Sequence, residues 1–198
     1  MQDLNLEDGS VCLLIRGVFS KDECVSMMTR LGDDIDWHRE TIKVYGKECR
    51  QNRTTAQYGE DGCSYSYSGT KHTGTGCIPE VLRYIQKIGA KRLINLEAIS
   101  DNNFNYFLLN RYKDGSENIG EHSDDEKGLS GPIVSFSFGA SRFFDIRKKK
   151  DKSKLRLNVH SGDCIVMSGN MQRYYKHGIP IQRKILEERF SVTLREII

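Results

Sequence analysis

The clearest strand patterns of this chain are residues 104–112, FNYFLLNRY, and residues 189–195, RFSVTLR. Both stretches are rich in β-branched and aromatic residues, which indicates strands. Successive side chains of a strand point to opposite faces, so the apolar residues of 189–195 share one face. The opposite face carries Arg189, Ser191, Thr193 and Arg195, while Asn110 and Tyr112 project together from the first strand. A sheet with one apolar and one polar face is therefore predicted.

Two further strands and two helices complete the predicted architecture. The strands are IVSFSF at 133–138 and CIVM at 164–167. A capping box, Ser20-Lys-Asp-Glu23, predicts a helix over 21–31 that ends at Gly32. Its expected apolar face consists of Val25, Met28 and Leu31. A second helix is expected from Pro79 to Gly89. Early helices and late strands predict an α+β fold, with a β-sandwich or jelly roll buttressed by helices on one side.

The composition bounds the class of protein. With 198 residues, 37% hydrophobic and 29% charged, the chain fits a single globular domain over residues 1–198. No run of about 18 apolar residues exists to span a membrane, and the acidic amino terminus lacks the order of a signal peptide. Six scattered cysteines without a CxxC pair indicate free thiols and a reducing, intracellular compartment.

The charge is distributed unevenly along the chain. The net charge is +3, yet residues 1–36 carry eight acidic and three basic residues, and residues 142–156 carry eight basic and two acidic residues. A basic cluster of this kind can neutralise phosphates, although a solvated surface loop is the commoner explanation for a single run. The run KKKDKSK within this cluster also fits a nuclear localisation signal. The acidic region fits a partner surface or a solubilising helix.

A possible metal site lies at His122-Ser-Asp124. An imidazole and a carboxylate two residues apart can reach one ion, and His177, 53 residues further on, is the candidate third ligand. Two histidines and one carboxylate with open positions suit non-haem Fe(II). The HxD pattern alone is also common by chance. The competing histidines are His38, His72 and His160, of which His160 lies in a VHSGD turn typical of a structural role.

The polar face of residues 189–195 allows two interpretations. It is either the solvent side of an antiparallel sheet or the wall of an enclosed anion site. Guanidinium groups bind carboxylates bidentately, so its two arginines, together with Asn110 and Tyr112, suit a small dicarboxylate.

Several ordered motifs resemble one known family. NRYKDGSENIGEHSDDE, PIVSFSFGASRFF, HSGDCIVMSG, YKHGI and RFSVTLRE look like the AlkB family of Fe(II)- and 2-oxoglutarate-dependent dioxygenases. Residues 44–69, VYGKECRQNRTTAQYGEDGCSYSYSG, resemble the nucleotide-recognition region of animal AlkB homologues that repair alkylated duplex DNA. The resemblance implies a double-stranded β-helix (jelly-roll) catalytic core over about 104–198. It also implies a β-hairpin nucleotide-recognition lid over about 38–75, and a monomer.

The same resemblance implies the cofactor residues. Fe(II) is expected at His122, Asp124 and His177, with 2-oxoglutarate at Asn110, Tyr112, Arg189, Ser191, Thr193 and Arg195. Arg189 is expected to hold the distal carboxylate of 2-oxoglutarate and Arg195 to support the region near the metal. The family usually has asparagine at the position of Ser191, whose shorter hydroxyl puts the geometry there in question.

Substrate contacts are implied in three regions. Tyr45, followed by Gly46 and Lys47, matches the aromatic wedge of the duplex-repair branch, although a hairpin residue fits the pattern too. Base contacts are expected from Tyr65, Ser66 and Tyr67, where a surface aromatic pair is the alternative. The carboxylates of Asp125 and Glu126 are expected to favour a cationic methylated base, while Arg53, Lys47 and the basic run 147–154 contact phosphates.

The function expected from these features is oxidative demethylation of N-alkylated bases such as 1-methyladenine and 3-methylcytosine in DNA. Because a buried iron cannot reach a stacked base, the substrate is a flipped base in duplex DNA or a single strand. The resemblance implies Fe(II), 2-oxoglutarate and O2, with formaldehyde released. Alternatives are methylated RNA, a protein side chain, or a jelly-roll binding module without catalysis. The expected location is intracellular, and nuclear in a eukaryote.

Overall fold

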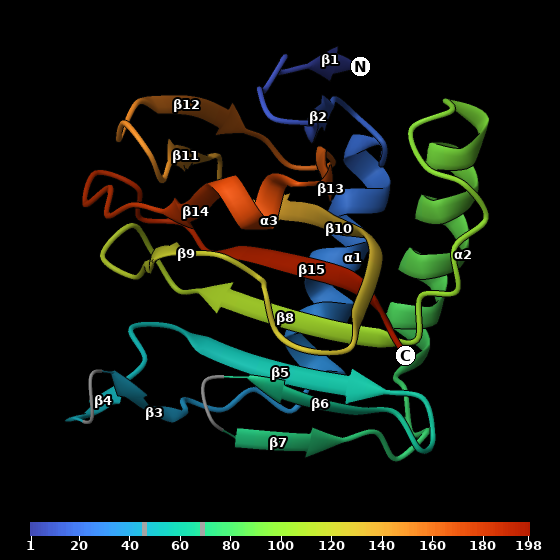
Figure 1. Ribbon diagram of the computed structural model, residues 1–198. Coiled ribbons are helices and arrows are strands. Elements are labelled where there is room, and N and C mark those ends of the chain that lie inside the picture. The colour runs from blue at the N-terminus through green and yellow to red at the C-terminus, as the bar shows by residue number, and fades with distance from the viewer. Residues whose placement is uncertain (45–46, 68–69) are drawn as a thin grey trace.

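Strands far apart in the sequence combine into two antiparallel sheets. The computed structural model describes residues 1–44, 47–67 and 70–198 (Figure 1). The larger sheet contains, in spatial order, β1 (Gln2–Asp3), β2 (Ser10–Ile15), β13 (Cys164–Gly169), β10 (Leu129–Gly139), β15 (Arg189–Ile197), β8 (Tyr106–Tyr112) and β5 (Thr54–Gly59). The smaller sheet contains β12 (Lys154–Val159), β11 (Arg142–Lys148), β14 (Tyr175–Ile179) and β9 (Ile119–His122). The predicted α+β fold with a jelly-roll core is confirmed.

Within the described ranges, three helices and two hairpins accompany the sheets. The helices are α1 (Lys21–Asp33), α2 (Glu80–Asn95) and α3 (Met171–Tyr174). One hairpin pairs β3 (Thr41–Val44) with β4 (Lys47–Arg50), and the other pairs β6 (Ser64–Tyr67) with β7 (Thr70–Thr73). A β-bridge between His38 and Thr55 ties the segment before β3 to β5, at the edge of the larger sheet. The hairpins therefore lie where a recognition lid was expected, within residues 38–75.

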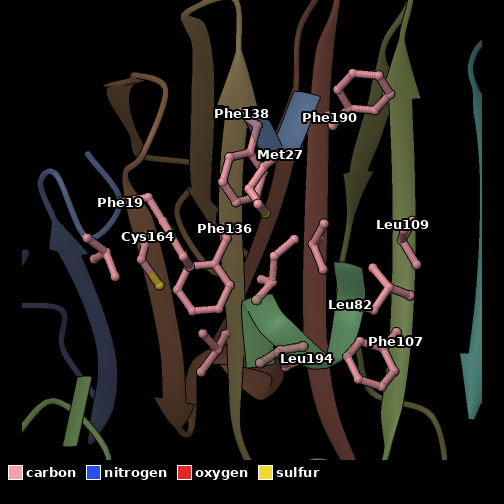
Figure 2. Packing of buried hydrophobic residues seen from close by; sticks show 14 of the residues in the cluster. Phe19, Met27, Leu82, Phe107, Leu109, Phe136, Phe138, Cys164, Phe190 and Leu194 are labelled. Carbon is pink, nitrogen blue, oxygen red and sulfur yellow. The ribbon is translucent and has the colours of Figure 1, made fainter. Parts of the chain in front are cut away.

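Two hydrophobic clusters cover the two faces of the larger sheet. The first lies between this sheet and helices α1 and α2, and Figure 2 shows Met27 and Leu82 of the helices with Phe136, Phe138 and Phe190 of the strands. The second fills the space between the two sheets. Because strand residues alternate, β15 sends its apolar side chains into the first cluster and its polar side chains toward the smaller sheet.

Helix α1 begins as the sequence predicts, but its buried face is different. Ser20 Oγ accepts from Glu23 N, and the Glu23 carboxylate accepts from Ser20 N, which completes the capping box. The buried residues are Cys24, Met27 and Leu31, whereas Val25 is 61% exposed. The predicted position of Val25 on the apolar face is wrong. Each residue turns an α-helix by 100°, and the side of α1 that packs against the sheet carries Cys24 and Met27, so the side chain of Val25 points away from the core. The helix also continues one residue past Gly32.

Helix α2 continues through the glycine that was expected to end it. Gly89 is buried within the helix, and a Cβ atom built there would lie 2.4 Å from Phe136 Cζ. The glycine is therefore required by the close approach of the helix to the sheet. Pro79 is the N-cap before the first turn, Asn95 is the last helical residue and Leu96 is the C-cap.

Replacing Gly89 with alanine is expected to destabilise the protein by about 1–3 kcal/mol, because the new methyl group overlaps the Phe136 ring. The matched control is Gly32→Ala in α1, where a Cβ meets nothing within 4 Å. That variant is expected to gain up to about 1 kcal/mol from helix propensity. Urea unfolding of both variants measures the difference, and equal stabilities would contradict the close packing of α2.

The larger sheet includes strands from outside the predicted catalytic core. Strands β1 and β2 extend one side and β5 the other, so residues before 104 complete the sheet. The stretch SVCLLI of β2 is buried on both faces, with Leu13 and Ile15 in the first cluster and Cys12 and Leu14 in the second. This continuous apolar run is typical of a strand covered on both sides.

All six cysteines fall within the described ranges and are free thiols, as the sequence indicates. Among the described helices, none is long and apolar enough to cross a membrane.

Candidate active site

His122, Asp124 and His177 meet between the two sheets. His122 ends β9 and lies opposite His177 of β14 in the ladder that joins these strands, with ring centroids 4.4 Å apart. Asp124 follows β9, and its two carboxylate oxygens each lie 3.6 Å from one imidazole Nε2. The three ligand atoms lie within 4.8 Å of one another. The structure thus brings together the three residues that the sequence predicted as a metal site.

The two imidazoles are oriented by their surroundings. His122 Nδ1 donates to the Gly120 carbonyl at 2.9 Å, which leaves Nε2 facing Asp124. Burial, and then the neighbouring His177, lower the pKa of His122 to about 4, so its ring is neutral at neutral pH. Phe144 stacks on the His177 ring at 5.4 Å. A neutral imidazole with a free Nε2 lone pair is the form that binds a metal ion.

The Asp124 carboxylate is held in its ionised form. Burial opposes its ionisation, but Arg195 and then His177 outweigh this effect and hold the pKa of Asp124 well below its usual range. Arg195 Nη2 lies 2.9 Å from Asp124 Oδ1, and both residues are buried. Arg195 therefore lies beside the metal ligands, as expected from the sequence.

The polar face of β15 lines the same cavity. Arg189, Ser191, Thr193 and Arg195 are 1–7% exposed, so the solvent-facing interpretation of this strand face is wrong. In the ladder with β8, Arg189 lies opposite Tyr112 and Ser191 lies opposite Asn110. All six predicted 2-oxoglutarate residues border this cavity together with the three candidate metal ligands: Asn110, Tyr112, Arg189, Ser191, Thr193 and Arg195.

Arg189 is a buried cation without an ion-pair partner in the part of the chain that the structure describes. Its Nη2 donates to Ser137 Oγ at 2.8 Å, and its guanidinium lies over the Tyr112 ring. Its Nε and Nη1 are buried with no hydrogen-bond acceptor among those same residues. Burial lowers the pKa of Arg189 to about 10. A desolvated guanidinium with two open donors fits a carboxylate ligand, so the residues present suit both Fe(II) and 2-oxoglutarate.

The sequence interpretation missed part of the cavity wall. Ser135 and Ser137 of β10 line or support it, since Ser135 Oγ accepts from Thr193 Oγ1 and Ser137 Oγ accepts from Arg189. In the sequence IVSFSF the two serines alternate with the two phenylalanines, so both serines could have been predicted on the polar face of this strand. Apolar wall residues come from five further elements and could not be located without knowing how the sheets pair: Leu108, Ile119, Phe144, Met167 and Ile179.

Arg53 does not lie where a phosphate contact was expected. Its side chain is buried, with the residue 4% exposed, and its Nε donates to Asn110 Oδ1. The reason is the pairing of β5 with β8, which places Thr55 opposite Asn110 and leaves Arg53 beside the cavity. The predicted phosphate contact of Arg53 is therefore wrong, and this residue instead orients the Asn110 amide.

The basic run also contains a buried residue. Lys148 is 9% exposed and pairs with Glu7 and Asp8 of the amino-terminal segment, so its predicted phosphate contact is wrong. Lys154 and Arg156 pair with Asp145, and Arg147 pairs with Glu121. Much of the positive charge of residues 142–156 is thus neutralised within the protein.

The remaining substrate residues lie in or near the hairpins. Tyr45 and Gly46 fall outside the described residues. Lys47 opens β4, and Tyr65, Ser66 and Tyr67 form part of β6, but only the backbone of these four residues is described. Next to the metal ligands, Asp125 is exposed and Glu126 is partly buried.

The competing histidines have other partners. His38 Nε2 lies 3.2 Å from Glu40 Oε1, and His160 Nδ1 bonds to Ser141 Oγ at 2.7 Å. His72 lies in β7, where only its backbone is described.

Family comparison agrees with the site. The profile of the 2OG-Fe(II) oxygenase superfamily matches residues 11–195, a range that includes all three candidate metal ligands. The chain belongs to this superfamily, whose members use Fe(II), 2-oxoglutarate and O2, and it is a dioxygenase enzyme of the AlkB type. The alternative of a binding module without catalysis is not supported.

Similar proteins include AlkB homologues from animals and plants. The human "DNA oxidative demethylase ALKBH2" is 31% identical over 194 residues, covering 91% of this chain and 71% of that protein. The Arabidopsis thaliana protein of the same name is 29% identical over 226 residues, covering 98% of this chain and 69% of that protein. The human "Alpha-ketoglutarate-dependent dioxygenase alkB homolog 3" is 28% identical, covering 94% and 66%.

Solved structures show the same fold. "The structure of OsALKBH1" matches with a TM-score of 0.64 at 20% identity, covering 98% of this chain and 100% of that one. A 2OG-Fe(II) oxygenase family oxidoreductase from Burkholderia pseudomallei matches with a TM-score of 0.63 at 14% identity, covering 96% and 86%. At these identities the likeness concerns the fold alone.

Proposed function

We propose that this enzyme oxidatively demethylates N-alkylated bases, such as 1-methyladenine and 3-methylcytosine, in DNA. The observation that carries the chemistry is the His122-Asp124-His177 group, which shares a cavity with Arg189, a guanidinium with two buried donors that meet no acceptor among the described residues. The nucleic-acid substrate is supported by the relatives named DNA oxidative demethylase, at about 30% identity over most of the chain.

Each cofactor has a defined set of residues in this proposal. His122, Asp124 and His177 hold Fe(II), and Arg189 holds the distal carboxylate of 2-oxoglutarate, with Asn110 and Tyr112 beside it. When bound, Fe(II) and O2 supply an oxidation that converts 2-oxoglutarate to succinate and carbon dioxide and the N-methyl group to formaldehyde. The protein contributes by keeping Asp124 ionised through Arg195 and by enclosing the site between two sheets.

Ser191 stands where the family usually has asparagine. In the ladder it lies between Ser137 of β10 and Asn110 of β8, and it is 5% exposed. The neighbouring strands therefore surround this position with further hydroxyl and amide groups. We propose that these neighbours supply the polar contacts that a longer side chain would make there.

A cationic base is favoured by the two carboxylates that follow the ligand Asp124 in the sequence. N1-methyladenine and N3-methylcytosine carry a positive charge that the undamaged bases lack. Asp125 is an exposed carboxylate directly after the ligand Asp124, with Glu126 following it. Opposite charges attract, so this pair lowers the energy of the damaged base relative to the neutral one. The lid residues Tyr45, Tyr65 and Tyr67 remain proposed contacts of the flipped base.

Phosphate contacts are proposed at one exposed hollow rather than along the whole basic run. Its lining consists of Arg147, Lys149, Lys152, Lys176 and Glu121. Glu121 and Lys176 precede the ligands His122 and His177 in β9 and β14, and successive strand residues point to opposite faces, so the hollow lies on the outer face of the smaller sheet. Four cations against one carboxylate leave excess positive charge for a nucleic-acid backbone.

Replacing Lys152 and Lys176, the two exposed lysines of this hollow, together with glutamine is expected to weaken DNA binding at every sequence tested. Each lost phosphate contact reduces the slope of log affinity against log salt by about 0.9 for duplex DNA. The matched control replaces Lys87 and Lys91 of α2, which are also exposed but lie on the helical side of the sheet. Fluorescence anisotropy at several salt concentrations measures both slopes. If the slope of log affinity against log salt is unchanged in the first variant, the hollow does not contact the phosphates of the DNA.

The function is tested by mass spectrometry of methylated oligonucleotides with and without 2-oxoglutarate. Single-stranded DNA, duplex DNA and RNA carrying the same methylated base are compared. Loss of the methyl mass from DNA only with 2-oxoglutarate is the expected result. Turnover of RNA alone would replace the DNA proposal, and turnover of single strands alone would exclude the Tyr45 wedge. No turnover of any nucleic acid, with succinate still formed, would point to another substrate.

A further inference from the structure

The loop that carries Asp124 is held by the segment that precedes His177. Asp124 N donates to Gln172 Oε1 at 2.9 Å, and Ser123 Oγ donates to the Tyr175 carbonyl at 2.9 Å. Gln172 belongs to the short helix α3, and Tyr175 is the first residue of β14. The stretch 171–177 thus supplies one candidate metal ligand and fixes the backbone of another.

The Gln172 side chain is itself held in place. A backbone N–H can only donate, so the amide oxygen must face Asp124, and the amide nitrogen donates to Met167 Sδ at 3.6 Å. Lys149 Nζ donates to the backbone carbonyl of Gln172 at 2.8 Å. Met171, which is fully buried, anchors α3 in the cluster between the sheets. The acceptor for Asp124 N therefore has a fixed position.

We propose that Gln172 is a positioning residue for the metal site. Its amide oxygen fixes the backbone at Asp124, so that the carboxylate stays between His122 and His177 while Arg195 contacts one of its oxygens. Among the described residues no other side chain bonds to Asp124 N, so without this acceptor the loop is held only through Ser123 and the carboxylate through Arg195. Hydrogen-bond partners of this kind typically change metal affinity by roughly 10–100-fold.

The test measures metal binding by the full chain without nucleic acid or 2-oxoglutarate, so its result is independent of the proposed substrate. Co(II) serves as the probe, because its absorption reports the ligand geometry. Gln172→Met removes the acceptor at similar length and is expected to weaken Co(II) binding roughly tenfold. Gln172→Glu keeps an acceptor oxygen and is expected to stay within about threefold of the native protein.

Gln86→Met is the matched control. Gln86 is also a partly buried glutamine, but its Nε2 donates to the Phe104 carbonyl, away from the metal ligands. Its replacement is expected to leave Co(II) affinity and absorption unchanged while costing a comparable amount of stability. If Gln172→Met does not fold, Gln172→Asn, whose shorter amide cannot reach Asp124 N, takes its place with the same expected result.

Two results would overturn the proposal. One is native Co(II) affinity in the variant that lacks the acceptor. The other is equal weakening in Gln172→Glu, because the retained oxygen would then make no difference.

Discussion

Replacing Arg189 with methionine is expected to raise the 2-oxoglutarate concentration needed for half-maximal succinate formation by about a hundredfold. This corresponds to about 3 kcal/mol, within the range for losing one member of a buried, charged hydrogen-bonded pair. The expectation follows from the two donors, Nε and Nη1, that are buried without acceptors among the described residues. Succinate formation at varied 2-oxoglutarate measures the change.

The Arg189→Met variant is also expected to keep the stability of the cofactor-free protein. Burial disfavours the charged form of Arg189, which has no carboxylate paired with it in the described residues. Exchanging this cation for an apolar side chain of similar length is therefore expected to leave the cofactor-free protein at least as stable as before. A loss of stability without any change in 2-oxoglutarate dependence would identify Arg189 as a structural residue.

Arg111→Met is the matched control for this variant. Arg111 lies on β8 and pairs with Glu188 at 2.9 Å, with about a third of each side chain exposed. Exposed pairs contribute about 0–1 kcal/mol. Its replacement is expected to leave the 2-oxoglutarate dependence within about threefold of the native enzyme.

Replacing His122 with alanine is expected to reduce Fe(II)-dependent succinate formation by more than about a hundredfold. Loss of a hydrogen-bond partner of a metal ligand already costs roughly 10–100-fold in affinity or activity, and loss of the ligand itself costs more. The His122 side chain is 27% exposed and lies at the end of β9, so the variant is expected to fold. Succinate formation after reconstitution with Fe(II), together with Co(II) binding, measures the effect.

His160→Ala is the matched control for the metal site. His160 is exposed and bonds to Ser141 Oγ at 2.7 Å, and it belongs to no group of three candidate metal ligands among the described residues. Its succinate formation is expected to stay within about twofold of the native enzyme. Equal activity of His122→Ala and the native protein would eliminate the proposed metal role.

Local patterns predict the parts of the fold that depend on neighbouring residues. The capping box locates the start of α1, and side-chain alternation alone separates the two faces of β15. The buried stripe of α1 and the passage of α2 through Gly89 depend instead on what the helices meet. Phe136, which requires that glycine, lies 47 residues further along the chain. Such long-range contacts leave no local signature.

In the candidate site, too, some residues could be predicted from local sequence and others depend on long-range contacts. His122, Asp124 and His177 have the residue types and spacing that a metal needs, so they are identifiable in the sequence. Arginine and lysine usually lie at the surface, which favours phosphate contacts for Arg53 and Lys148. The partners that bury them, Asn110 and Glu7, are supplied by strand pairing and by the amino-terminal segment. Charge alone does not reveal which cations are neutralised internally.

The central place of β15 makes the enzyme intolerant of damage near residue 189. This strand joins β10 to β8, and it carries both Arg189 and Arg195. A premature stop before it would divide the larger sheet into two halves and remove both guanidinium groups at once. Such a truncated chain should therefore be inactive and unfolded, with no weakened intermediate form.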